Sequence, residues 1–373
     1  MLKNIFKHYV YPVATLASSI IGVGFLSLPY IALKIGIWPM SFYFVALTTL
    51  VVFIHIILGQ ISLRTPDFKR WPGFVGFYLG TWPKQIIMVT MTAGIFGVML
   101  VYLIVGSQFL SVVFSPIFGG NALTYVLVYF AIAALCLYFG VKTISKVDFL
   151  ALLLLVIILG ITFFEGFSHI RASNFFLHTA NFQKNFFLPY GALLFSLWGA
   201  GFIPETEEMV RGNKKVLKKV IILSTLIPAI FYFLFTFLIV SITGSGTTES
   251  ALVGLKNFLS PGVISVALLM GVITTFIAFI AEGFLLKKIF MYDLGVKEFH
   301  SWVLVCCVPL LLFLLGINSF IPLISFIGGV LLSIDGILIM LMYKKIGGKP
   351  IIIYPLVIFF VLGIMYELIY FLK

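Results

Sequence analysis

Charged residues are scarce in this chain of 373 residues, because Asp, Glu, Lys and Arg make up only 10% of it and hydrophobic residues make up 62%. A soluble globular protein has about 25% charged residues. This composition therefore excludes a soluble globular protein and predicts a polytopic membrane protein. Acidic residues are fewer than basic ones, with 12 Asp and Glu against 24 Lys and Arg. We interpret the basic excess as the marking of cytoplasmic loops. The expected partner is therefore the lipid bilayer, and no nucleic acid.

Cysteine and histidine are also rare. Cys136, Cys306 and Cys307 all lie in apolar runs, and their spacing matches neither a disulfide framework nor a metal site. The five histidines are scattered along the chain, and no cluster of His, Cys or carboxylate residues has catalytic spacing. We therefore expect that the protein is not an enzyme, has no cofactor and holds no metal other than a coupling ion.

Long apolar runs dominate the chain, and a membrane-spanning helix needs roughly 20 such residues. The first run is longer than the core of a signal peptide and has no clear cleavage site, so we interpret it as a span. The runs predict eleven spans, at residues 9–33, 37–62, 86–114, 122–141, 147–166, 188–210, 217–242, 261–288, 301–316, 320–343 and 351–371.

Basic residues give the orientation of these spans. With the N-terminus inside the cell, 19 of the 24 Lys and Arg residues fall in cytoplasmic segments, as the positive-inside rule requires. The sequence thus predicts a multi-pass protein of a prokaryotic plasma membrane, with its N-terminus inside and its C-terminus outside. We also expect a short interfacial helix at 73–80, a surface lid or short helix within 167–187, and an external loop with a half-helix at 243–260.

The first span is interrupted in its middle. Ser18, Ser19, Gly22 and Gly24 precede Pro29, although Gly costs about 1 kcal/mol and Pro about 3 kcal/mol relative to Ala inside a helix. Lipid cannot pair the main-chain groups that a break exposes. Broken spans are typical of transporters, which bind substrate and ions at the exposed backbone.

The sixth span is interrupted in a similar way, at Gly199-Ala200-Gly201 and again at Pro204. Because the residue before a proline is disfavoured in the α conformation, we predict that Ile203 is not helical. The simpler alternative is that these glycines only allow neighbouring helices to pack closely.

The two interruptions predict an internal repeat. Gly22 and Gly199 lie 177 residues apart, and each begins a set of five spans. An odd number of spans places the two sets in inverted topology. We predict a single transmembrane transporter domain, 1–373, with repeats at about 9–166 and 188–343 and an extra helix at 351–371.

The segment Ile21–Pro29, IGVGFLSLP, resembles the first-helix G-x-G-x-L-x-L-P signature of the amino acid–polyamine–organocation superfamily. Within it the chain is most similar to the amino acid/auxin permease and aromatic amino acid permease families, whose second-to-third-helix loop the segments 64–66 and 72–80 also resemble. The resemblance implies an all-α, five-plus-five inverted-repeat fold of the LeuT type, with broken helices one and six, and coupled uptake of amino acids.

The two breaks together predict a receptor for an amino acid zwitterion. A helix N-terminus carries about half a positive charge and unpaired amides, so the amides near Gly24 can bind the carboxylate. Carbonyls from Trp198 through Ala200 can accept from the ammonium group. No charged side chain lies within either break, which favours a neutral substrate, and the flanking aromatics can pack on an apolar side chain unless they are ordinary core residues. The predicted site comprises Ser19, Gly22, Val23, Gly24, Phe25, Trp198, Gly199, Ala200, Gly201 and Phe202.

The resemblance also implies a candidate sodium site. Sodium-coupled members have a small residue followed by two hydroxyl residues in the eighth span, which Gly271, Thr274 and Thr275 match here. The carbonyls of Ser18 and Ile21 would complete it. In the alternative, the two threonine hydroxyls bond to carbonyls of their own helix.

Acids within spans are the rival coupling device, since such residues are costly and functional by default. Glu205, Asp335 and Glu282 are the candidates for proton coupling, and Glu205 matches the position that several relatives are suspected to use. Asp335 and Glu282 have the alternative of pairing with a lysine. His55, in the second span, is predicted to be a packed core residue.

These observations predict a secondary active transporter, a symporter, for neutral and hydrophobic or aromatic amino acids, working by alternating access. A passive facilitator or channel and a transporter-like amino acid sensor are the alternatives. The substrate side chain, the choice between sodium and proton, and the oligomeric state stay open.

Overall fold

The computed structural model describes residues 9–66, 69, 71–139, 157, 159–176, 185–210 and 212–371. Ten of the eleven predicted spans coincide with helices there, and the other, 147–166, lies mostly outside the described residues. The continuous spans are α4 (Ile37–Arg64), α6 (Thr81–Phe118), α7 (Ala122–Phe139), α12 (Lys214–Thr243), α13 (Pro261–Lys288), α14 (Glu298–Leu314) and α17 (Pro350–Phe371). The interrupted spans are α2 (Tyr11–Ile20) with η2 (Val23–Ser27) and α3 (Leu28–Ile35), and α10 (Leu188–Leu197) with η5 (Ala200–Phe202) and α11 (Ile203–Met209). The tenth span is a continuous helix made of α15 (Phe320–Phe326), the π-helical turn η9 (Ile327–Leu331) and α16 (Leu332–Lys345).

By length and composition, seven helices in the described part of the chain can cross a membrane, and the bent pair in the first span makes an eighth. The seven include Phe320–Lys345, whereas α14 is a shorter apolar helix and is not among them. The predicted helix in the second connection is confirmed as α5 (Trp71–Leu79). In the described parts of the two long connections 167–187 and 243–260, the structure has four short pieces: η3 (Phe167–His169), η4 (Ala172–Phe176), η6 (Gly244–Gly246) and η7 (Leu252–Asn257).

The chain forms two compact units. Unit 1 contains residues 1–91, 180–236 and 325–373, and unit 2 contains residues 92–179 and 237–324. The first two spans of each predicted repeat belong to unit 1, and the third and fourth spans of each belong to unit 2. The first four spans of one repeat thus share a unit with their equivalents in the other. The fifth spans do not, because the described part of 147–166 lies in unit 2 and most of 320–343 lies in unit 1.

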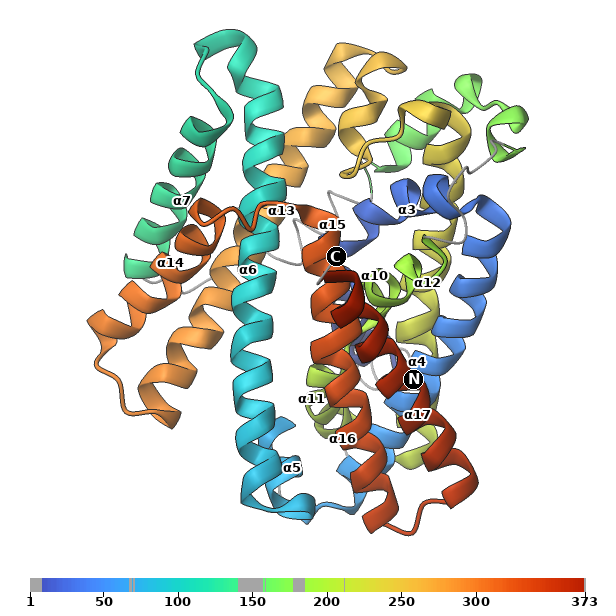
Figure 1. Ribbon diagram of the computed structural model, residues 1–373, viewed down its shortest axis with the longest axis vertical. Helices are drawn as coiled ribbons and strands as arrows, with labels where there is room; N and C mark the ends of the chain where they lie inside the picture. Colours follow the sequence, from blue (N-terminus) through green and yellow to red (C-terminus); the bar gives the residue numbers. More distant parts are fainter. Residues whose placement is uncertain are drawn as a thin grey trace. The chain divides into compact units, whose positions relative to one another are not determined.

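Unit 1 is built around α10. This short helix packs against α4, η2 and η9, while α16 lies beside α17 and α4 (Figure 1). Glycines allow the closest approaches, because a Cβ on Gly328 of η9 would overlap the Gly191 carbonyl of α10. Small residues at helix contacts are the usual means of tight packing in membranes.

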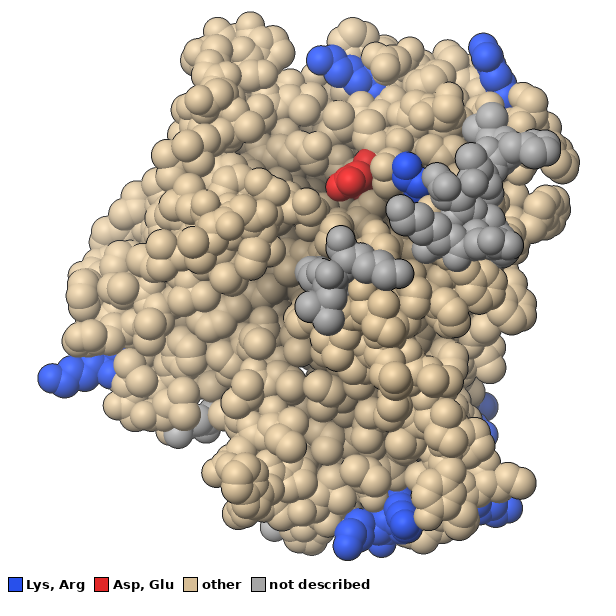
Figure 2. Space-filling model, in the orientation of Figure 1, with Lys and Arg blue, Asp and Glu red and all other residues tan. Residues whose placement is uncertain are grey.

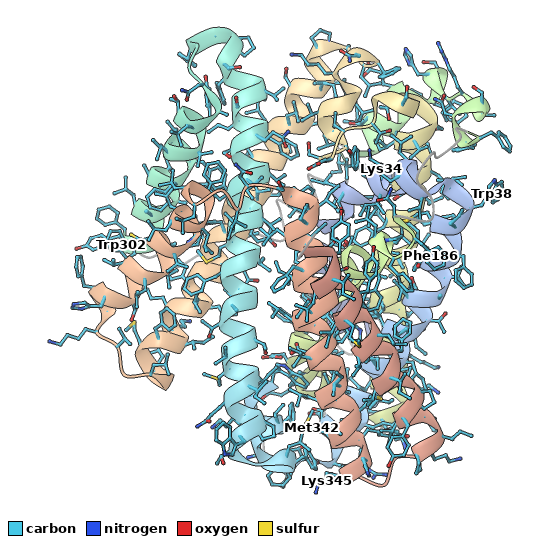
Figure 3. The ribbon with its side chains drawn as sticks, in the orientation of Figure 1. Lys34, Trp38, Phe186, Trp302, Met342 and Lys345 are labelled. Carbon is cyan, nitrogen blue, oxygen red and sulfur yellow. The ribbon has the colours of Figure 1, made fainter. Side chains whose placement is uncertain are left out.

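One end of unit 1 is rich in basic side chains. Figure 3 labels Lys345 at the end of α16, and Figure 2 shows Lys and Arg side chains gathered around that end. Arg64, the last residue of α4, donates to the Ile346 carbonyl on the same side. Lys34 lies at the opposite end of the unit (Figure 3). This separation fits the predicted topology, in which Arg64 and Lys345 are cytoplasmic and Lys34 is external.

Unit 2 has α13 at its centre, packed against α7 and α14. The Trp302 indole N–H of α14 donates to the Ala134 carbonyl of α7 over 2.9 Å. At the end of α13, the Lys287 ammonium donates to Glu298 over 2.8 Å. This hydrogen bond joins the end of α13 to the first residue of α14.

Candidate functional site

The first break consists of two residues in extended conformation. Ile21 has φ −76° and ψ 94°, and Gly22 has φ −120° and ψ −168°. The 3-10 helix η2 then begins at Val23, and the two halves of the span meet at an angle of 48°. Because a helix cannot pair its own first amides, those of Val23 and Gly24 have no acceptor within η2. The first break therefore presents main-chain donors.

The second break has the same construction. α10 ends at Leu197, Trp198 is extended with φ −79° and ψ 122°, and Gly199 follows with φ −132° and ψ 17°. Trp198 and Gly199 lie 177 residues after Ile21 and Gly22. The two spans thus break at equivalent positions of the predicted repeats.

Ile203 is helical, so its predicted non-helical conformation is wrong. It has φ −63° and ψ −42° and is the first residue of α11. Pro204 lies in the first turn of that helix, where the missing N–H breaks no helical hydrogen bond and the fixed φ of proline suits the helix. The restriction on a residue before proline is a preference, and here the start of a helix overrides it.

The two breaks lie directly against each other in unit 1, in antiparallel fashion. A Cβ on Gly24 would lie 2.6 Å from Ser196 Oγ, on the last turn before the second break. A Cβ on Gly199 would lie 2.6 Å from Ile20 Cγ1, on the last turn before the first break. The start of η2 therefore lies close to the end of α10, and the second break lies close to the end of α2.

The carbonyls of the second break are only partly available. The Gly199 carbonyl accepts from the Phe202 amide over 3.1 Å, and the Ala200 carbonyl accepts from the Ile203 amide. The acceptors that α10 leaves unpaired are those of its own last turn, ending at Leu197, and the Trp198 carbonyl. The carbonyls available to an ammonium group are therefore those at the end of α10 and of Trp198, and not those of Gly199 and Ala200.

Tyr232 of α12 closes the end of α2. Its hydroxyl donates to the Ile20 carbonyl over 3.0 Å, and its ring stacks on Phe25 with centroids 5.2 Å apart. Phe231 and Phe235 meet Phe25 edge-on, and only 1% of Phe25 is exposed. The Phe25 side chain is therefore core, and only its main chain is available to a ligand.

We expect Tyr232→Phe to loosen the first break without unfolding the protein. The variant keeps the ring on Phe25 and removes only the hydroxyl, so the loss is a single hydrogen bond of about 1 kcal/mol. Melting temperature and amino acid affinity, measured on the purified variant, should both fall modestly. Tyr292→Phe, at a side chain that is 77% exposed, is the control and should change neither. An unchanged affinity for Tyr232→Phe would show that the Ile20 carbonyl needs no cap.

His55 of α4 closes the second break. The Gly199 amide donates to His55 Nε2 over 3.2 Å, and His55 Nδ1 lies 3.2 Å from Thr225 Oγ1. Since Nε2 accepts, a neutral imidazole must carry its proton on Nδ1 and donate it to Thr225. The residue is completely buried, as predicted for a core residue, but its contact with the break was not predicted from the sequence.

The two caps are reciprocal. His55 and Tyr232 lie 177 residues apart, the same interval that separates Gly22 from Gly199. His55 belongs to the first repeat and caps the break of the second, whereas Tyr232 belongs to the second repeat and caps the break of the first. Equivalent positions thus serve opposite breaks, one by accepting from an amide and the other by donating to a carbonyl.

The other predicted substrate residues differ in how open they are. Ser19 donates to the Leu16 carbonyl over 2.8 Å within its own helix. Trp198 is half-buried, with its ring centroid 5.8 Å from that of His55, whereas Phe202 is 48% exposed. A Cβ on Gly201 would meet nothing within 4 Å. Of the three aromatic residues in the predicted substrate site, Phe202 and Trp198 have side-chain surface left for a ligand, whereas Phe25 is buried.

Comparisons with known proteins add the family. Residues 9–361 match the model of the family described as transmembrane amino acid transporter protein. The chain belongs to this family. No curated protein matches it. Among solved structures, the inward facing conformation of Mhp1 is similar, with a TM-score of 0.67 and 13% identity over 90% of this chain and 75% of that chain. At that identity the likeness shows the fold, which is the predicted LeuT type of a polytopic helical membrane protein.

The predicted sodium ligands of the transporter are divided between the two units. Ser18 and Ile21 belong to unit 1, and Gly271, Thr274 and Thr275 belong to unit 2. The hydroxyl of Thr275 donates to the Gly271 carbonyl over 2.8 Å, and that of Thr274 donates to the same carbonyl over 3.1 Å. Within unit 2, a Cβ on Gly271 would overlap Phe109 of α6. The threonines thus adopt the bonding of the simpler alternative, and the sodium site stays a prediction.

The predicted acids of the transporter also lie in both units. Asp335, half-buried in the first turn of α16, has the indole of Trp71 from α5 as its polar neighbour. Glu205 is half-buried in the first turn of α11, and Glu282 is half-buried in α13 of unit 2. Neither acid of unit 1 belongs to the breaks themselves, so proton coupling at these three residues stays a prediction.

Proposed function

We propose that this transporter is a symporter that takes up neutral amino acids and binds them between its two breaks. The observation that carries the proposal is the antiparallel contact of the breaks, with Gly24 against Ser196 and Gly199 against Ile20. It brings unpaired amides of one span beside unpaired carbonyls of the other. An α-amino acid needs both kinds of group, and the breaks supply them without a charged side chain.

Each end of the zwitterion has an assigned partner in the proposal. The carboxylate binds the amides of Val23 and Gly24, where the dipole of η2 and α3 favours negative charge. The ammonium group donates to carbonyls at the end of α10, through Trp198. Phe202 and Trp198 then pack on the substrate side chain, which favours hydrophobic or aromatic amino acids. Absence of a fixed charge disfavours cationic and anionic substrates, whose side chains would be left unpaired.

Coupling to an ion gradient completes the proposal. Sodium would use the carbonyls of Ser18 and Ile21 with Gly271, Thr274 and Thr275, and protons would use a buried acid. Transport would proceed by alternating access in a prokaryotic plasma membrane, with the N-terminus inside. The topology is supported by the basic end of unit 1, where α4 and α16 both terminate.

Uptake into proteoliposomes tests the function. We expect labelled neutral amino acids with large apolar side chains to accumulate when an inward sodium or proton gradient is imposed. Lysine and glutamate serve as charged controls and should not accumulate. Accumulation driven by protons in sodium-free buffer would contradict the sodium assignment of Thr274 and Thr275. Equal fluxes in both directions without accumulation would instead indicate a facilitator, and binding without any flux would indicate a sensor.

A further inference from the structure

The last helix holds an acid for which the transport scheme above has no role. Glu367 lies in α17, four residues before its end, and only 1% of the residue is exposed. Neither carboxyl oxygen has a hydrogen-bond partner among the described residues. An ionised carboxylate in such a place is costly, and acids buried inside membrane proteins are functional by default.

Two glycines from different helices make room for this carboxyl. A Cβ on Gly191 of α10 would lie 2.9 Å from Glu367 Oε1, and one on Gly329 of η9 would overlap the Glu367 side chain. The same Cβ on Gly191 would also overlap the main chain of Ser325. Glu367 is therefore enclosed by α10 on one side and by the π-helix η9 on the other, and π-helical turns often mark functional sites.

Among the described residues, no positive charge neutralises this carboxyl. Those of α10, α15, η9 and α17 include no Lys, Arg or His, and the two lysines of α16 lie in its last turn, where Lys344 donates to Tyr354 near the start of α17. Its titratable neighbours are Tyr190 of α10 and Tyr366 of α17. Tyr190 is already engaged, with its hydroxyl 2.7 Å from Ser333 Oγ. Asp335, six residues along from Gly329, has its polar contact with Trp71 instead.

The polar atoms nearby include acceptors for a protonated carboxyl. The Ser325 hydroxyl is completely buried and also has no partner, and the Ser325 carbonyl lies beside Oε1 at Gly191. A neutral carboxyl can donate its proton to such an oxygen, whereas a carboxylate can only accept. The enclosed arrangement thus suits the protonated form, and ionisation requires water to enter between α17 and α10.

We propose that Glu367 is the proton-binding site of this transporter. The proposal rests on the symport function above and names its coupling ion. A proton from external water binds to the carboxylate while α17 is parted from Gly191 and Gly329, and the neutral carboxyl then allows these helices to close. From Gly191 to Trp198, α10 extends about 10 Å. One short helix therefore joins the proton site to the second break, which links proton binding to substrate binding.

The test compares Glu367→Gln with wild type in sodium-free proteoliposomes. Wild type should accumulate the labelled amino acid under an inward proton gradient. Glu367→Gln imitates the protonated carboxyl permanently, so accumulation should fall at least about tenfold, a common size for coupling between sites. Exchange of labelled against unlabelled amino acid, which needs no net proton movement, should persist. Glu208→Gln, at an exposed acid of α11, is the matched control and should keep both activities.

The outcomes separate the two proposals. Exchange by wild type reports the transport function, and its absence for every amino acid would overturn that function and this role with it. Proton-driven accumulation by Glu367→Gln at the wild-type level would overturn the proton site alone, as would wild-type accumulation that requires sodium. If Glu367→Gln does not purify as a folded protein, Glu367→Asp carries the test. It must shift the pH at which uptake is half-maximal, and an unchanged value would overturn the proposal.

Discussion

Gly199→Ala is expected to weaken amino acid binding at least about tenfold, which corresponds to about 1.4 kcal/mol. The new methyl group would lie 2.6 Å from Ile20 Cγ1 and 3.0 Å from Ile20 Cδ1. A β-branched side chain is stiff at χ1, so Ile20 cannot easily turn aside. Overpacking of this kind costs about 1–3 kcal/mol and shifts backbone, and here the backbone that must shift is the proposed binding site.

The measurement is the dissociation constant of the purified variant for the amino acid that the uptake panel identifies. Gly24→Ala approaches the same contact from the other span, because its methyl group would meet Ser196 and Phe195, and it should weaken binding similarly. Gly262→Ala is the control, since a Cβ there meets nothing within 4 Å. If Gly199→Ala and Gly262→Ala bound the substrate equally well, the contact between the breaks would have no part in recognition.

His55→Leu is expected to reduce both stability and affinity. The substitution keeps much of the volume but leaves the Gly199 amide buried without an acceptor, which costs about 1–3 kcal/mol. Freed from His55, the second break can also move, so the carbonyls at Trp198 lose their fixed positions. We expect a lower melting temperature and a dissociation constant raised at least about tenfold.

Two further variants isolate the hydrogen bond. His55→Gln offers an amide oxygen that can accept from Gly199, and we expect it to recover part of both losses. His300→Leu, at an exposed position of α14, controls for the loss of an imidazole elsewhere. Wild-type affinity in His55→Leu would disprove the role of the cap, and equal losses in His55→Leu and His55→Gln would assign the effect to packing alone.

The backbone plan could be predicted from the sequence because it depends on local chemistry. Glycine and proline interrupt apolar runs visibly, and the interval between Gly22 and Gly199 recurs in the structure as the interval between the extended residues Ile21 and Trp198. Ile203 is the local exception. There a steric preference competes with the start of a helix, and sequence alone does not say which one prevails.

The side chains that complete the site could not be predicted in the same way. Tyr232 bonds to a carbonyl 212 residues away, and His55 accepts from an amide 144 residues away. Nothing in an apolar run distinguishes such a residue from an ordinary core residue. Glu367 could not be predicted for another reason, because it lies in α17, outside the two predicted repeats, and no motif marks it. Checking whether polar residues in equivalent spans lie 177 positions apart would have singled out His55 and Tyr232.

The reciprocal caps tie the two predicted repeats together. The same position carries an acceptor in one repeat, His55, and a donor in the other, Tyr232. Neither half carries the cap for its own break, and each half depends on the other to finish its broken helix.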